Sequence, residues 1–152
     1  MSDAVTLMYR DHRVLTALLD RLAVPTSDRV ALVEEVAARL TAHLRAEEKV
    51  YPLLTDPDGP DGGSRPRIPV DGSVEDSLRI LRATDPAGPD FDAALREFVV
   101  AVTEHLREES DLLRDIARRV GPQTLRAAGT IFDTRRLQEL RVYGVDDDPG
   151  PA

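Results

Sequence analysis

Apolar residues recur at alternating spacings of three and four along most of this chain, and this periodicity constrains the fold more than any other feature. Such spacing lines apolar side chains along one face of an α-helix, where they pack against other helices. It predicts helices over residues 2–22, 28–54, 73–83, 91–120 and 123–142. No alternation typical of a β-strand extends beyond a few residues. The expected fold class is therefore all-α.

The connections between these segments predict how the helices are arranged. We expect residues 1–120 to form an antiparallel up-down four-helix bundle. Residues 121–145 are expected to form a short additional C-terminal helix on or beside the bundle, and residues 146–152 a disordered tail. Nearly half of the residues from Thr55 to Gly72 are proline or glycine, which indicates a long surface connection. The arginines of the last helix are read as a solvated basic face: Arg126, Arg135, Arg136 and Arg141.

Composition excludes several classes of protein. The chain has no cysteine, which rules out disulfides, cysteine-ligated zinc and iron–sulfur clusters. Its net charge of −8 argues against nucleic-acid and anionic-membrane partners, because both require a basic surface. Neither an apolar stretch of membrane-spanning length nor a signal-peptide pattern is evident, so we expect a cytoplasmic protein.

The chain has only three histidines, and each occupies an apolar-face position of a predicted helix. They are His12, His43 and His105, and the last two are followed four residues later by Glu47 and Glu109. Residues four apart on a helix lie about 5–6 Å apart at Cβ, close enough to hold one metal centre. The alternatives are hydrogen-bonded structural histidines or surface ion pairs. Burying five such groups without a cation would cost several kcal/mol, which favours a metal site.

These motifs carry a family resemblance over residues 2–120. Asp11-His12-Arg13, His43-x-x-x-Glu47 leading to Tyr51-Pro52-Leu53-Leu54, and His105-x-x-x-Glu109 resemble the hemerythrin-like HHE cation-binding proteins. The resemblance implies two iron ions, oxo- or hydroxo-bridged, between the helices of the bundle, with manganese or zinc as less favoured metals. It also implies that the two glutamates bridge the metals and that the three histidines are terminal ligands.

The third predicted helix departs from the family pattern, which has a histidine there. The spacing of Glu75 from Leu78 and Leu81 matches that of the first-helix histidine from its leucines, so we predict Glu75 as an inward ligand. Asp76 is the competing ligand, because it directly follows a glutamate as the family's third-helix histidine often does. Asp76 also suits a helix-capping position, and Glu75 an ion pair with Arg79.

Tyr51 lies one helical turn beyond Glu47, and we include its phenol among the predicted metal ligands. The alternative is an aromatic core residue whose hydroxyl reaches water. Tyr9 precedes His12 by three residues and is expected to lie beside the site rather than in it.

Each anionic ligand stabilises an oxidised metal in a core of low dielectric constant. The predicted ligand set therefore favours reductive activation of dioxygen, peroxide or nitric oxide over reversible oxygen carriage. We expect a di-iron oxidoreductase that uses an electron donor. If it oxidises a small organic substrate, residues 55–72 are expected to form the lid over the substrate pocket. The alternatives are a non-catalytic module that binds or senses oxygen, nitric oxide or iron, and a metal-free helical interaction protein.

Overall fold

The computed structural model describes residues 2–24, 28–55 and 72–147, which contain five α-helices and no strand. The all-α prediction is confirmed, and each helix begins and ends within two residues of its predicted bounds. The helices are α1 (Ala4–Leu22), α2 (Arg29–Leu54), α3 (Gly72–Ala83), α4 (Phe91–Arg119) and α5 (Pro122–Val142).

Local sequence accounts for the helix ends. The Asp3 side chain caps α1 by accepting a hydrogen bond of 2.9 Å from the Thr6 backbone N–H. Pro122 occupies the start of α5, where its missing N–H removes no helical hydrogen bond. Pro52 lies inside the last turn of α2, and the helix ends at Leu54, two residues beyond it.

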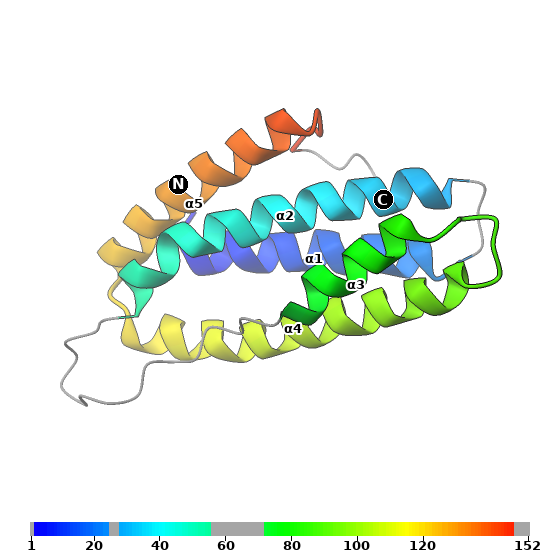
Figure 1. Cartoon of the computed structure of the whole chain (residues 1–152). Coiled ribbons are helices and arrows are strands. Elements are labelled where there is room, and N and C mark those ends of the chain that lie inside the picture. Colours follow the sequence, from blue (N-terminus) through cyan, green and yellow to red (C-terminus); the bar gives the residue numbers. More distant parts are fainter. Residues whose placement is uncertain (1, 25–27, 56–71, 148–152) are drawn as a thin grey trace. The chain divides into compact units, whose positions relative to one another are not determined.

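The chain divides into two compact units, one of residues 1–66 with 113–152 and the other of residues 67–112. The first unit contains α1, α2, α5 and the last turns of α4, and the second contains α3 and the rest of α4. Within the first unit, α2 packs most extensively on α5, α1 packs on both, and α2 runs antiparallel to both (Figure 1). The antiparallel four-helix arrangement over residues 1–120 stays a prediction.

The C-terminal helix α5 is a core element of the first unit. Ala128 and Phe132 are fully buried, and Leu140 nearly so. Arg136 on the same face is only 3% exposed, so the prediction that it belongs to a solvated basic face is wrong. The error arose because two of its three carboxylate partners, Asp11 and Asp147, lie outside α5 and reach Arg136 only in the folded chain.

A close approach of the chain's start to α5 explains a glycine in the middle of this helix. A Cβ added at Gly129 would lie 2.4 Å from the Ser2 carbonyl oxygen and 2.9 Å from the Ala4 nitrogen. Only glycine leaves room for backbone to pass at this distance.

We therefore expect Gly129→Ala to destabilise the protein, although alanine is the better helix former. The helical preference is about 1 kcal/mol in favour of alanine, whereas overpacking against backbone costs about 1–3 kcal/mol. Chemical denaturation followed by circular dichroism measures the difference. Ala127→Gly, at an exposed neighbouring position of α5, serves as a control for helix propensity alone. A more stable Gly129→Ala variant would contradict the close approach.

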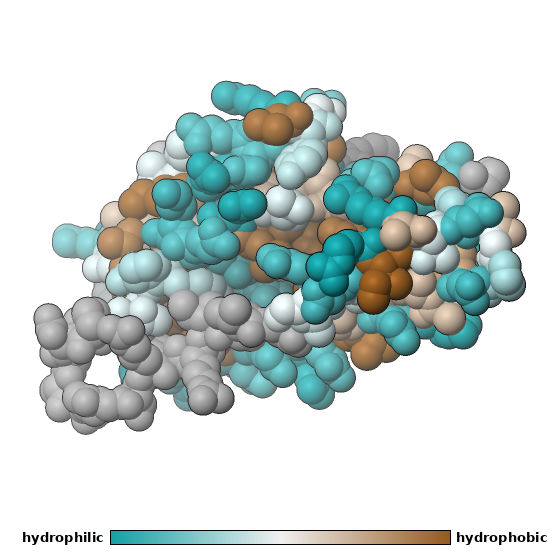
Figure 2. Space-filling view, in the orientation of Figure 1, coloured by the Kyte–Doolittle hydropathy of each residue, from teal (hydrophilic) through white to brown (hydrophobic). Residues whose placement is uncertain are grey.

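Exposed apolar side chains are spread over several helices, and in Figure 2 they lie among hydrophilic ones. In the described part of the chain, no helix combines the length and apolar character that crossing a membrane requires. The predicted lid and surface connection fall on residues 56–71, outside the described residues. The same is true of residues 148–152 of the predicted tail, whereas Asp146 and Asp147 are described and contact arginines.

Candidate metal centre

Helices α1 and α2 bring His12, His43 and Glu47 together inside the first unit. All three side chains are buried, and the ring centroids of the two histidines are 5.1 Å apart. His43 Nε2 lies 2.5 Å from Glu47 Oε1. One donor atom from each of the three residues lies within 4.8 Å of the others. The inward positions predicted from the apolar periodicity are therefore observed for this group.

Two aromatic residues flank the imidazoles. The Phe132 ring of α5 contacts the His43 ring edge-on at a centroid distance of 5.7 Å, and the Tyr9 ring contacts His12 at 6.0 Å. Tyr51 is 2% exposed and lies one turn beyond Glu47 on α2, as the sequence predicts. Sequence reasoning did not assign Phe132 to the site.

Asp11 contacts the His43 ring nitrogen opposite the one that faces Glu47. It was not predicted as a functional residue. Its Oδ2 lies 3.1 Å from His43 Nδ1, a hydrogen-bond distance. A proton on Nδ1 satisfies the carboxylate and leaves the lone pair of Nε2 facing Glu47. No direct signal for this pairing was present in the sequence, because Asp11 lies 32 residues from His43 along the chain and only the packing of α1 against α2 brings them together. A carboxylate in this place is the partner that a metal-binding histidine usually has.

The second His-x-x-x-Glu motif forms its own pair in the second unit. His105 Nε2 lies 3.2 Å from Glu109 Oε2 on α4, and both side chains are buried. Neither ring nitrogen of His105 makes a well-formed hydrogen bond to the residues that the structure describes. A buried imidazole in this condition suits a metal ligand.

The two third-helix candidates are exposed. Asp76 pairs with Arg79 at 3.0 Å across one turn of α3. The buried face of α3 is marked by Val74 and Leu81, and Glu75 lies beside that face rather than on it. The prediction that Glu75 occupies an inward position is wrong, because two leucine spacings did not define the buried face of so short a helix.

The donors in the first unit fit a transition-metal cation. The His43 lone pair and a Glu47 oxygen are both electron-rich and stand 2.5 Å apart, an approach that requires a shared proton or metal ion. His12 adds a third donor of a type that iron, manganese and zinc accept. A metal ion satisfies all three donors at once, whereas a proton satisfies two.

Comparison with known families decides what kind of protein carries this geometry. A model of the hemerythrin HHE cation-binding domain matches residues 3–117. The chain belongs to this family. Neither the curated proteins nor the solved structures gave a match. The resemblance to this family that the two His-x-x-x-Glu motifs indicated is confirmed. The buried histidine and glutamate donors of this HHE protein lie within the matched residues.

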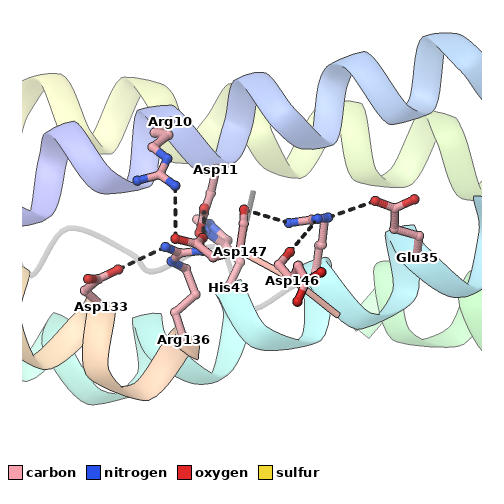
Figure 3. A network of polar contacts seen from close by, with 9 residues as sticks. Arg10, Asp11, Glu35, His43, Asp133, Arg136, Asp146 and Asp147 are labelled. Atoms are coloured by element: carbon pink, nitrogen blue, oxygen red, sulfur yellow. Dashed lines mark hydrogen bonds and ion pairs between the residues drawn. The ribbon is translucent and has the colours of Figure 1, made fainter. Parts of the chain in front are cut away.

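An arginine from beyond the matched residues of this HHE protein reaches the surroundings of the site. Arg136 Nη1 lies 3.6 Å from Asp11 Oδ1 and 2.6 Å from Asp147 Oδ1, while its Nη2 lies 2.9 Å from Asp133 Oδ1 (Figure 3). Burial lowers the pKa of Arg136, but these three carboxylates outweigh it and raise that pKa above its ordinary value.

Asp147 lies in the C-terminal turn that follows α5, and its carboxylate pairs with arginines of α5 and α1. Besides Arg136, it pairs with Arg10 at 3.2 Å. Burial raises the pKa of Asp147, but the hydrogen bond and charge of Arg136, followed by those of Arg10, hold it below its ordinary value. Arg39 adds a backbone contact, donating to the Asp146 carbonyl at 2.8 Å.

This depressed pKa gives a pH-dependent prediction for Asp147→Asn. A group whose pKa is lower in the folded state stabilises it fully above the unfolded value of 3.8, and the stabilisation is lost as the pH falls through the folded pKa. We expect Asp147→Asn to cost about 1 kcal/mol near neutral pH, a figure reduced for the 35% exposure of the side chain. The cost should shrink below about pH 4. Denaturation at several pH values measures it, with exposed Asp146→Asn as control; an unchanging cost down to pH 2 would contradict the assignment.

Proposed function

We propose that this HHE protein is a cytoplasmic non-haem di-iron oxidoreductase that reductively activates dioxygen, peroxide or nitric oxide. The observation that carries the proposal is the buried group of His12, His43 and Glu47, whose donor atoms lie within 4.8 Å of one another. Nitrogen and carboxylate donors without sulfur suit iron, with manganese or zinc less favoured. Membership of a cation-binding family supports the same conclusion.

We propose that His105 and Glu109 complete the centre and that residues 1–120 form the predicted antiparallel bundle around it. The family match spans both His-x-x-x-Glu motifs, which supports a single centre served by both. Glu47 and Glu109 would then hold two metal ions together with the imidazoles of His12, His43 and His105. Tyr51 is proposed as a further ligand because its ring is buried one turn from Glu47.

When bound, iron supplies one-electron redox chemistry towards these small oxidants, with electrons from an external donor. The residues of this chain bind the metal, orient it and exclude water. Glu47 and Glu109 bring negative charge that favours an oxidised metal, since opposite charges attract strongly in a core of low dielectric constant. Fully or nearly fully buried side chains of the first unit keep bulk water from the imidazoles: Met8, Leu15, Val36, Leu40 and Phe132.

Metal analysis with an optical spectrum of aerobically purified protein tests the proposal. We expect about two iron ions per chain, with charge-transfer absorption in the near ultraviolet. A phenolate band at longer wavelength would identify Tyr51 as a ligand. Turnover of hydrogen peroxide and of nitric oxide with a chemical reductant then separates catalysis from binding. Reversible oxygen spectra without turnover would instead identify a binding or sensing module, and metal-free protein would reject the proposal.

The same metal analysis settles the third-helix ligand. Both side chains are exposed, so Glu75→Ala and Asp76→Ala should each retain the iron content of the unaltered protein. Loss of iron in Glu75→Ala would restore that residue to the ligand set and require α3 to turn its exposed face inward.

A further inference from the structure

Arg136 of the C-terminal helix completes a largely buried polar triad beside the candidate metal ligands of the first unit. The triad consists of Arg136 on α5, Asp11 on α1 and His43 on α2, and all three belong to the same compact unit. Asp11 joins the other two, with one carboxylate oxygen 3.1 Å from His43 Nδ1 and the other 3.6 Å from Arg136 Nη1. Figure 3 shows these three side chains within one polar network.

Burial makes the triad a specific arrangement rather than a chance surface contact. The side chain of His43 is 0% exposed, that of Arg136 is 4% exposed and that of Asp11 is 12% exposed. A buried guanidinium needs carboxylate partners, and Arg136 has three of them, from α1, α5 and the C-terminal turn. Asp133 and Asp147 therefore hold Arg136 in the position from which it reaches Asp11.

The position of Arg136 determines how the Asp11 carboxylate is oriented towards His43. With Arg136 attracting one carboxylate oxygen, the Asp11 carboxylate is directed inward and its other oxygen accepts from His43 Nδ1. A proton fixed on Nδ1 leaves the Nε2 lone pair directed at Glu47, the geometry that metal binding requires. Without Arg136, Asp11 would gain solvation by turning towards water, and the His43 ring would lose its fixed tautomer.

We propose that Arg136 is a positioning residue that acts through Asp11 to fix the tautomer and orientation of His43. Residue 136 lies beyond the 3–117 region that the family model matches, so the C-terminal helix of this chain tunes a site that the family region contains. The effect on metal affinity rests on the proposed function, whereas the effect on the His43 tautomer does not.

Arg136→Met tests the proposal, with Arg135→Met as the matched control. Arg135 is the neighbouring arginine, and its guanidinium pairs with Glu139 at 2.6 Å on the same helix. Long-range ¹H–¹⁵N spectra of metal-free protein report the proton position in each of the three imidazoles. Competition with a chelator under anaerobic conditions gives the affinity for Fe²⁺.

We expect the unaltered protein and Arg135→Met to carry the His43 proton on Nδ1. Arg136→Met should show a mixed or Nε2-protonated His43, and its Fe²⁺ affinity should fall about 10- to 100-fold, the usual effect of removing a partner of a metal ligand. Arg136→Lys, which restores the positive charge, should recover part of both signals. A structural role alone would lower stability without moving the tautomer.

An Arg136→Met variant that keeps both the Nδ1 proton and the Fe²⁺ affinity would overturn the proposal. If this variant does not fold, Arg136→Gln takes its place with the same two measurements and the same criterion. A shifted tautomer in a protein that binds no Fe²⁺ would support the coupling of Arg136 to His43 and reject the proposed function.

Discussion

Glu47→Gln is expected to remove most of the metal that the proposed site binds. The change preserves the size of the side chain but replaces an anionic donor, which lies 2.5 Å from His43 Nε2, with a neutral amide. Loss of a partner one step removed from a metal typically lowers affinity 10- to 100-fold, so loss of a ligand should lower it more than about 100-fold. Iron content after purification and a chelator titration of the remaining iron measure the effect.

Glu48→Gln is the matched control, because it removes the same charge from the next residue of α2. The Glu48 side chain is exposed, whereas Glu47 is buried. The control should keep the iron content and affinity of the unaltered protein. Equal iron in the two variants would show that the metal, if bound, is held elsewhere.

Removing the metal should lower the melting temperature by about 10 °C. A ligand present at 1,000 times its Kd stabilises the folded state by about 4 kcal/mol. For a chain of this size, each kcal/mol corresponds to about 2–4 °C. Calorimetry with Fe²⁺ under anaerobic conditions and again with excess chelator measures the shift.

The Glu47→Gln variant separates this effect from any action of the chelator itself, because its melting temperature should be the same in both conditions. A chelator that leaves the unaltered protein at its original melting temperature would favour a metal-free helical protein.

The helices and the inward histidines were predictable because both follow from one repeating pattern. An apolar spacing of three and four sets the buried face of a long helix, and His12, His43 and His105 each fall on it. The spacing of four residues between histidine and glutamate then brings each pair together without reference to the rest of the fold. His43–Glu47 and His105–Glu109 lie 2.5 and 3.2 Å apart as a result.

The errors occurred where the structure depends on contacts between distant segments. Arg136 looked like one of several surface arginines, and only tertiary packing brings Asp11 and Asp147 to it. Glu75 was assigned from a spacing borrowed from another helix, although α3 is short and buries Val74 and Leu81 instead. Local periodicity therefore predicts which residues share a helix face, but it does not identify the partner of a buried charge.

The contact between Phe132 and His43 has a practical consequence for the choice of truncated fragments of this protein. The family match ends at residue 117, which makes that position an obvious place to truncate the chain. A fragment ending there would lack α5, and with it the aromatic ring that lies 5.7 Å from the His43 imidazole and the arginine that holds Asp11. Such a fragment would expose one flank of a proposed metal ligand to water and to dissolved chelators. A weak metal affinity measured on it would therefore describe the truncation rather than the intact protein.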